Sequence, residues 1–129
     1  MKERLILFSG QMVRAILDGR KTQTRRLRDK GWKIGDRLWV QGKSRINLEI
    51  TGKRKERLQD ISAKDVESEG LDVASRLPAF PPRGKLDHIV NRIAKDMFSE
   101  LWDSLYGKIE GKRWEDNPNV WVYEFKRVN

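Results

Sequence analysis

The amino-acid sequence predicts an α+β fold, built as a small mixed β-barrel with flanking helices. Short segments with the alternating or continuous apolar pattern of strands are interspersed with a few segments of helical spacing. The last strand pattern closes the C-terminal end of the chain, where its pairing would tie the two ends of the sequence together. At 129 residues the chain is long enough for one hydrophobic core, so residues 1–129 are expected to form a single domain.

The first expected elements are a strand and a short helix. The apolar run 5–8 predicts a buried strand, and Ser9 after it is suited to cap a helix. The apolar residues of that helix fall on one stripe, made of Met12, Val13, Ile16 and Leu17. Gly19 is expected to end the helix, because glycine readily takes the positive φ of the C′ position.

The next segment, 22–27, alternates and is predicted to be a strand. In a simple pleat Lys21 would point to one face and Thr24 to the other. The two side chains can meet only if the strand begins after Lys21 or bulges there. Whether they share a site is therefore a question for the structure.

The middle of the chain predicts a turn at 33–36, a strand at 37–40 and a half-buried strand beginning at Ile46. That strand continues through 53–58, which is basic on both faces and is expected to be an exposed edge. Residues 62–65 resemble a capping box and predict a short helix, which Gly70 ends.

The last third of the chain contains the longest regular pattern. Residues 76–85 are rich in proline and predict a loop. Apolar residues at helical spacing then predict a core-facing helix, with the members Ile89, Val90, Ile93, Met97, Phe98, Leu101, Trp102 and Leu105. A polar connection leads to 120–125, which predicts the final strand.

Composition excludes several kinds of site. The chain has no cysteine and one histidine, His88, so a disulfide, a cysteine nucleophile and a structural zinc site are ruled out, and we expect no metal and no cofactor. It has no apolar run near eighteen residues and no long apolar segment at its start. We therefore expect a cytoplasmic protein without a membrane partner.

Positive charge is concentrated in one part of the chain. Residues 14–57 hold 15 of the 28 Lys and Arg residues but only 5 of the 19 Asp and Glu residues. A directed basic patch favours a polyanionic partner, and RNA bound through segment 14–57 is one expectation. A solvated basic face without a partner is the alternative.

Segment 19–26 combines a lysine, two threonines and three arginines just after the first helix. A hydroxyl near a lysine can be an activated nucleophile, and flanking arginines attract a phosphate-bearing or electron-rich substrate. These properties predict hydrolytic chemistry on a nucleoside or on RNA. The spacing of a nucleoside-triphosphate-binding P-loop is missing.

The same segment, Gly19-x-Lys21-x-x-Thr24-x-Arg26, resembles the ASCH domain, a relative of the PUA-like β-barrels. The later motif Gly-Asp-x-Leu-x-Val at 35–40 and the closing strand 122–125 are similar to that family as well. The resemblance covers about residues 5–75 and 119–128. It implies that about 78–118 is a helical insertion, of a kind that also occurs in phage-encoded ASCH proteins.

Many ASCH proteins have Glu where this chain has Thr24. The sequence Gly-Arg-Lys-Thr-x-Thr is instead similar to the bacterial N4-acetylcytidine amidohydrolases of the family. The resemblance implies that Lys21 and Thr24 are catalytic. It also implies a catalytic glutamate in the short helix after the central strands, matched here by Glu69, with Glu67 as the alternative that the helix register would select.

Amide hydrolysis by these residues has two versions. In the first, Lys21 removes the proton of Thr24, which attacks the acyl carbon, and Glu69 shuttles a proton to the leaving cytosine amine. Burial and the neighbouring arginines would lower the pKa of Lys21 as this requires, whereas a close Glu69 would raise it. In the second, a charged Lys21 stabilises the oxyanion and Glu69 activates water.

Three further residues are expected at the substrate: Arg20, Arg26 and Trp39. Arg26 would line the site or form an internal ion pair, and Trp39 would stack on a base or fill the core. Two other functions remain open, a non-catalytic RNA-binding PUA-like module and a metal-independent ribonuclease. In the first, phosphates would be bound by four cations of the predicted edge: Lys53, Arg54, Lys55 and Arg57.

Overall fold

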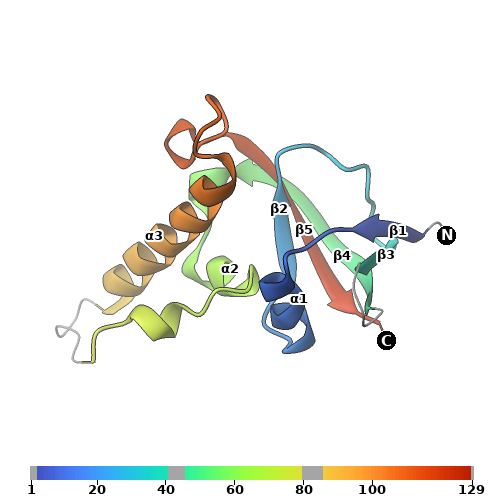
Figure 1. Ribbon diagram of the computed structural model, residues 1–129, viewed down its shortest axis with the longest axis horizontal. Helices are drawn as coiled ribbons and strands as arrows, with labels where there is room; N and C mark the ends of the chain where they lie inside the picture. The colour runs from blue at the N-terminus through green and yellow to red at the C-terminus, as the bar shows by residue number, and fades with distance from the viewer. Residues whose placement is uncertain (1–2, 41–45, 80–85, 129) are drawn as a thin grey trace.

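The computed structural model describes residues 3–40, 46–79 and 86–128, and over these residues it has an α+β fold. Five strands form one mixed sheet, which three α-helices accompany (Figure 1). The strands are β1 (Glu3–Ile6), β2 (Gln23–Arg26), β3 (Arg37–Val40), β4 (Ile46–Arg57) and β5 (Asn119–Arg127). The helices are α1 (Gly10–Leu17), α2 (Ala63–Ser68) and α3 (Leu86–Tyr106).

The sheet has the order β1-β3-β4-β5-β2, with β1 parallel to β3 and the other neighbours antiparallel. Among the described strands β1 and β2 stand at opposite edges and do not pair with each other. The α+β class is therefore confirmed, but the sheet is open, and the closed barrel expected from the sequence is wrong. Closure would need a ladder between β1 and β2, but among the described residues β1 pairs with β3 and β2 pairs with β5.

The basic part of β4 is an edge, as predicted, but only some of its side chains are exposed. β3 pairs only with Ile46–Glu49 of β4, so among the described residues the second half, from Gly52 to Arg57, pairs with β5 alone. Side-chain partners make this position possible for cations. Lys53 forms an ion pair with Asp29, with Nζ 2.9 Å from Oδ1, and Arg54 forms ion pairs with three carboxylates.

The first strand is displaced from its prediction. β1 ends at Ile6, which is buried, whereas Leu5 and Leu7 are exposed and Phe8 is half-buried. Because β1 is an edge strand, Leu5 faces solvent while Ile6 faces the core. Leu7 and Phe8 lie beyond the strand and are free to contribute to the wall of a cavity.

The helix ends follow the predicted signals. The side chains of Ser9 and Ser62 accept hydrogen bonds from Met12 N and Asp65 N, at 3.3 and 3.1 Å, and cap α1 and α2. Gly19 and Gly70 follow the helix ends with φ of 79° and 109°. Part of the predicted loop, residues 80–85, lies outside the described residues.

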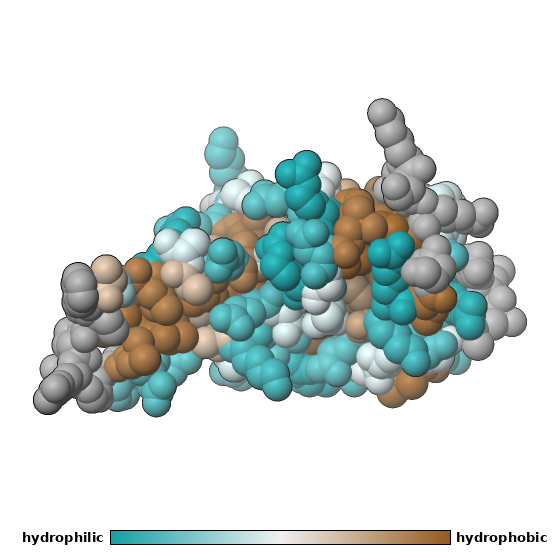
Figure 2. All heavy atoms as spheres, turned by 90° about the horizontal axis from the view of Figure 1, so that it is seen from below, coloured by the Kyte–Doolittle hydropathy of each residue, from teal (hydrophilic) through white to brown (hydrophobic). Residues whose placement is uncertain are grey.

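Two apolar clusters occupy the two faces of the sheet. The alternation of β5 sends Val120 and Val122 to one face and Tyr123 and Phe125 to the other. The first pair packs with residues of α2 and α3, and the second pair with Trp32 and the apolar side of β3, β4 and α1. In Figure 2 apolar side chains gather at the α3 end, while the middle of that face is largely hydrophilic.

Within the described residues no helix is long and apolar enough to cross a membrane. His88 is exposed at the start of α3. The part of the chain that the structure describes has no group of three or more His, Cys, Asp or Glu residues arranged to hold a metal ion.

Candidate active site

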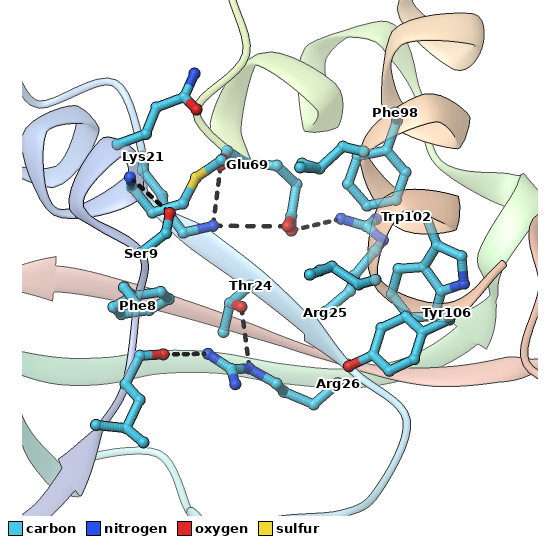
Figure 3. Close-up of a pocket in the computed structure, with 15 residues that line it drawn as sticks. Phe8, Ser9, Lys21, Thr24, Arg25, Arg26, Glu69, Phe98, Trp102 and Tyr106 are labelled. Atoms are coloured by element: carbon cyan, nitrogen blue, oxygen red, sulfur yellow. Dashed lines mark hydrogen bonds and ion pairs between the residues drawn. The ribbon is translucent and has the colours of Figure 1, made fainter. Parts of the chain in front are cut away.

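A cavity of about 420 Å³ lies at edge strand β2 (Figure 3). Its walls come from β2, the segment that leads into α1, the first turn of α1, the end of α2 and the C-terminal half of α3. Its polar and charged lining includes Lys21, Thr24, Arg25, Arg26 and Glu69. This cavity therefore contains all three residues that the sequence suggested as catalytic.

Lys21 and Thr24 share the cavity because β2 begins at Gln23, after Lys21. The turn that precedes β2 is fixed by the main chain. Lys21 N donates to Ala15 O of α1 at 3.1 Å, and Thr22 N donates to Ser68 O at the end of α2 at 2.8 Å. The second bond brings Glu69 beside Lys21, although the two residues are 48 positions apart. Because β2 begins after Lys21, the alternation of the strand does not force Lys21 and Thr24 to opposite faces.

The Lys21 ammonium is buried among oxygen atoms, and the residue is only 5% exposed. Its Nζ donates to the main-chain oxygens of Gln23 and Glu69, at 2.8 and 2.9 Å, and lies 3.6 Å from Glu69 Oε1. Burial lowers the pKa of Lys21 below its ordinary value, and this effect outweighs the opposing effect of the Glu69 charge. The charges of Arg26 and Arg25 also act to lower it.

The register of α2 selects Glu69 over Glu67. Glu69 is the C-cap residue of α2, is 5% exposed and lines the cavity, whereas Glu67 lines a separate hollow. The Glu69 carboxylate lies between two cations. Oε1 faces Lys21, and Oε2 accepts a hydrogen bond from Arg25 Nη1 at 3.1 Å.

Thr24 is also 5% exposed, and its hydroxyl lies between the Lys21–Glu69 pair and Arg26 (Figure 3). Thr24 Oγ1 accepts a hydrogen bond from Arg26 Nε at 3.2 Å. Arg26 Nη2 donates to Leu7 O at 3.4 Å, and the guanidinium carbon lies 5.3 Å from the centre of the Phe8 ring. Because Oγ1 accepts from Arg26, its own hydrogen can be donated to a base.

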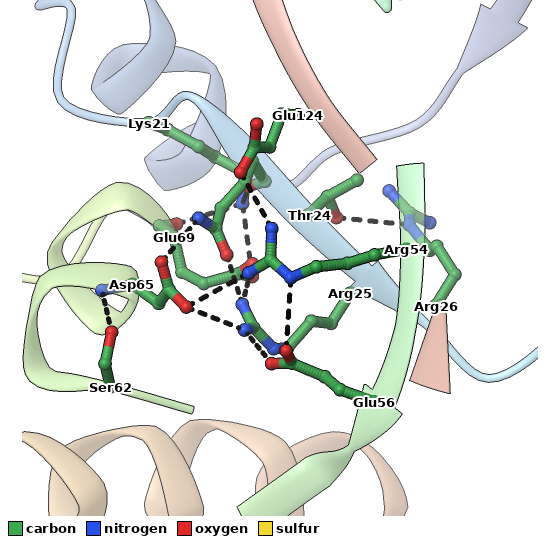
Figure 4. A network of polar contacts seen from close by, with 11 residues as sticks. Lys21, Thr24, Arg25, Arg26, Arg54, Glu56, Ser62, Asp65, Glu69 and Glu124 are labelled. Atoms are coloured by element: carbon green, nitrogen blue, oxygen red, sulfur yellow. Dashed lines mark hydrogen bonds and ion pairs between the residues drawn. The ribbon is translucent and has the colours of Figure 1, made fainter. Parts of the chain in front are cut away.

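Behind the cavity lies a connected set of charges, here called the ion network (Figure 4). Its members are Arg25, Arg54, Glu56, Asp65, Glu69 and Glu124. The Arg25 side chain is fully buried, and its Nη2 lies 2.5 Å from Glu56 Oε1 and 3.3 Å from Asp65 Oδ2. Its Nη1 donates to both Glu69 Oε2 and Gln23 Oε1.

The opposite wall is apolar and aromatic. The side chains of Phe98, Trp102 and Tyr106 follow one face of α3 beside the cavity (Figure 3). The rings of Trp102 and Tyr106 lie 4.6 Å apart, and Phe8 contributes a further ring from the segment before α1. Such a wall offers surface on which a planar ring can stack.

The structure does not bring Arg20 and Trp39 into this cavity. Arg20 Nη1 donates to Gly70 O at 3.0 Å, and its Nη2 forms an ion pair with Asp18 at 3.2 Å. Arg20 lines the separate hollow beside Glu67. Trp39 is half-buried on β3, which β4 and β5 separate from β2.

Sequence reasoning missed two parts of the site. From the sequence Arg25 was only one of the three arginines of segment 19–26, although residues 23 and 25 of a strand point to the same face. It also predicted that the aromatic residues of α3 face the core. Phe98 and Trp102 do so and also line the cavity, a distinction that helical spacing does not make.

Comparison with solved structures finds this fold in several proteins. The chain aligns over 98% of its length with all of the hypothetical protein PH0355, at 17% identity and a TM-score of 0.59. It aligns over 98% of its length with 79% of an ASCH domain from Lactobacillus crispatus, at 20% identity and a TM-score of 0.55. It also aligns over 99% of its length with 99% of protein PF0455 from Pyrococcus furiosus, at 17% identity and a TM-score of 0.54.

No protein-family model matches the chain, and no curated protein matches it. The structural likeness shows that the chain has the fold of an ASCH domain, which the motifs of the sequence indicated.

Proposed function

We propose that this protein is an amidohydrolase that removes an acyl group, such as acetyl, from the N4 amine of cytidine or a related nucleoside. The observation that carries the proposal is the meeting of Lys21, Thr24 and Glu69 on one cavity. These residue types, in this order, match those of the N4-acetylcytidine amidohydrolases that segment 19–26 resembles. The aromatic wall on α3 supports the proposal, because a planar pyrimidine ring can stack against it.

The hydrogen bonds of Lys21 suit the role of a base. A neutral amine has two N–H groups, and the main-chain oxygens of Gln23 and Glu69 accept two hydrogen bonds from Nζ. The remaining position of Nζ can therefore hold a lone pair or a third proton. The lowered pKa of Lys21 favours the lone pair, which is the form that can take a proton from Thr24.

The proposed reaction has two stages. Lys21 takes the hydroxyl proton of Thr24, Oγ1 bonds to the acyl carbon, and the carbonyl π electrons move to its oxygen. When this intermediate collapses, the carbon–N4 bond breaks and N4 receives the proton from Lys21 through Glu69. In the second stage a water molecule attacks the acyl carbon of the acyl-Thr24 ester and gives a proton to Lys21. The bond between that carbon and Thr24 Oγ1 then breaks, and Oγ1 takes the proton from Lys21.

The experiment follows the absorbance change from N4-acetylcytidine to cytidine in the presence of a chelator. We expect the unmodified protein to release cytidine and acetate, Thr24→Ser to retain activity, and Thr24→Val to fall by about 10²-fold or more. Thr51→Val is the matched control, because Thr51 is exposed on β4 and does not line the cavity. Unchanged activity in Thr24→Val would contradict Thr24 as the nucleophile and would favour attack by a water molecule that Glu69 activates.

RNA binding is a second candidate function, favoured by one surface. Lys53 Nζ and Lys55 Nζ lie 5.0 and 5.8 Å from the ring centre of Trp121, and these three residues are called the β4 patch. An aromatic ring flanked by cations suits a base and its neighbouring phosphates. Arg54, which we expected to bind phosphate, is instead engaged in the ion network.

Binding of labelled single-stranded RNA at several salt concentrations tests this second function. The double variant Lys53→Gln/Lys55→Gln is expected to reduce the slope of log affinity against log salt by about 1.4, because each phosphate contact contributes about 0.7. Lys108→Gln/Lys112→Gln removes the same charge at exposed positions outside the patch. An equal reduction of the salt slope in the two double variants would exclude the β4 patch as the binding surface.

A further inference from the structure

We propose that Arg25 is a positioning residue, which holds the Glu69 carboxylate by one oxygen and so leaves Lys21 available as a base. This inference rests on the proposed function. Neither the motif in segment 19–26 nor the likeness to solved structures assigns a role to Arg25. The contacts around one carboxylate support the assignment.

The two cations compete for Glu69, and Arg25 has the closer contact. Arg25 Nη1 lies 3.1 Å from Oε2, whereas Lys21 Nζ lies 3.6 Å from Oε1. Hydrogen bonds between an ammonium and a carboxylate are usually about 2.7–2.9 Å long. Glu69 is thus held short of a close ion pair with Lys21, and such a pair would fix the proton on the lysine.

Arg25 cannot follow the carboxylate towards Lys21. Its Nη2 is held by Glu56 and Asp65, at 2.5 and 3.3 Å, and its Nη1 also donates to the side chain of Gln23. These partners come from β4, α2 and β2, and the arginine side chain is fully buried among them. A guanidinium can bind in several directions at once because its donors form a rigid fork.

The charges around Lys21 explain why this position matters. Glu69, after α2, raises the pKa of Lys21, while Arg25 and Arg26 on β2 lower it. On the remaining walls α1 presents the uncharged Met12, and α3 presents Tyr106. Loss of Arg25 would remove one lowering charge and release Glu69 towards Lys21, and both changes raise the pKa of Lys21.

The test compares Arg25→Gln with Arg54→Gln. Arg54 shares Glu56 and Asp65 with Arg25, but its ion pairs do not include Glu69. The titration of Lys21 is followed by NMR with labelled lysine, and kcat/KM for N4-acetylcytidine is measured against pH. In Arg25→Gln the Lys21 titration is expected to move to higher pH, and kcat/KM at neutral pH to fall about tenfold and recover as the pH is raised.

Arg54→Gln is expected to change neither the Lys21 titration nor the pH profile. A folded Arg25→Gln protein with the unmodified Lys21 titration would overturn the inference. If Arg25→Gln does not fold, the Lys21 titration is measured in Arg25→Lys instead. An ammonium lacks the fork that reaches Glu56 and Glu69 together, so the titration is again expected to move to higher pH. An unmoved titration in that variant overturns the inference equally.

The two readouts separate this inference from the proposed function. The NMR titration needs no substrate, so it tests the hold of Arg25 on Glu69 in any case. An unmodified protein without hydrolytic activity would contradict the amidohydrolase alone. An unmoved Lys21 titration in an active enzyme would contradict the role of Arg25 alone.

Discussion

The ion network and the β4 patch both draw cations from the basic segment 14–57, yet they hold them in different ways. In the network Arg25 is fully buried, and three carboxylates surround it. In the patch Lys53 has one carboxylate partner and lies over an aromatic ring. Burial of a charge is costly unless partners fix it, so Arg25 has a defined geometry, whereas Lys55 of the patch is exposed.

The surroundings of the ion network suit a chemical reaction, whereas the β4 patch suits the attraction of an anion. The proposed catalysis needs atoms at fixed distances and a base with a lowered pKa, and both come with burial. An outer cation in high dielectric changes the energy of folding little, but it can attract an anion from solution. We therefore expect the largest effects from changes at buried residues and the smallest from changes at exposed ones.

The largest effect is expected from Glu69→Ala. Both Lys21 and Arg25 lose a buried carboxylate partner, so the free energy of unfolding should fall by about 3–5 kcal/mol in urea denaturation. The control is Glu110→Ala, which removes an exposed carboxylate outside the network and should change stability by about 0.5 kcal/mol or less. A similar fall in the free energy of unfolding in both variants would show that burial does not determine how strongly the contacts of Glu69 stabilise the fold.

Gly70→Ala should disturb the cavity from its main chain. Gly70 has a φ of +109°, and an added Cβ would lie 3.2 Å from Ala15 Cβ and 3.3 Å from Lys21 Cβ. Strain and crowding should lower the free energy of unfolding by about 1–3 kcal/mol, as measured by urea denaturation.

The matched change Gly10→Ala places a Cβ in open space at the start of α1. We expect it to leave stability unchanged or slightly higher, because alanine favours helix more than glycine does. Equal stability of the Gly70 and Gly10 variants would refute the close packing of Gly70 against Lys21.

Arg54→Met should have an intermediate effect. The Arg54 side chain is 38% exposed, and it forms ion pairs with Glu56, Asp65 and Glu124. Thermal or urea unfolding should show a loss of about 1 kcal/mol that shrinks at high salt, because solvent and ions screen a half-exposed pair. A fall in the free energy of unfolding as large as that of Glu69→Ala would contradict a weaker contribution from the half-exposed Arg54 than from the buried Arg25 and Glu69.

The smallest effect concerns Asp29, the carboxylate partner of Lys53. Hydrogen bonds from Gly31 N, Lys53 and Tyr123 lower the pKa of Asp29 from 3.8 to about 2. The stability that Asp29 contributes is therefore complete above the unfolded value and is lost as the pH falls towards about 2.

NMR titration of the Asp29 carboxyl checks the value directly. Lys53→Met should raise the midpoint only in part, because the main-chain bond from Gly31 has the largest effect on the pKa and remains in the variant. A midpoint at the ordinary aspartate value in the unmodified protein would contradict the contacts that bind Lys53 to this loop.

Local signals in the sequence predicted the elements well. The caps Ser9 and Ser62 and the turn glycines Gly19 and Gly70 act through residues only a few positions away, so their effects can be inferred from a short window. Segment 37–40 forms the strand that its pattern predicts, and the apolar spacing of α3 was recognised for the same reason.

Contacts distant in sequence were harder to predict. The basic half of β4 contacts carboxylates and rings elsewhere in the chain, among them Asp65 and Trp121, which its own pattern does not reveal. The open sheet depends on strand pairing, which no single segment reveals. The contacts of Arg25 were missed because its partners are distributed over distant elements.

The three residues proposed as catalytic do line one cavity, while their catalytic roles stay a prediction. A short motif carried Lys21 and Thr24, and the register of α2 in the structure selected Glu69. The expected contacts of Arg20 and Trp39 depended on the shape of the cavity, which the sequence does not contain. The helical insertion proposed for 78–118 remains a prediction, and the structure places α3 within it.

Trapping the acyl group on Thr24 tests the central claim most directly. Excess enzyme is mixed with N4-acetylcytidine, quenched in acid at successive times, digested and analysed by mass spectrometry. The predicted result is an acetyl ester on the peptide that contains Thr24, formed as cytidine is released and absent from Thr24→Val. Release of cytidine by the Thr24→Val protein at the unmodified rate, with no acetyl on that peptide in either protein, would contradict it.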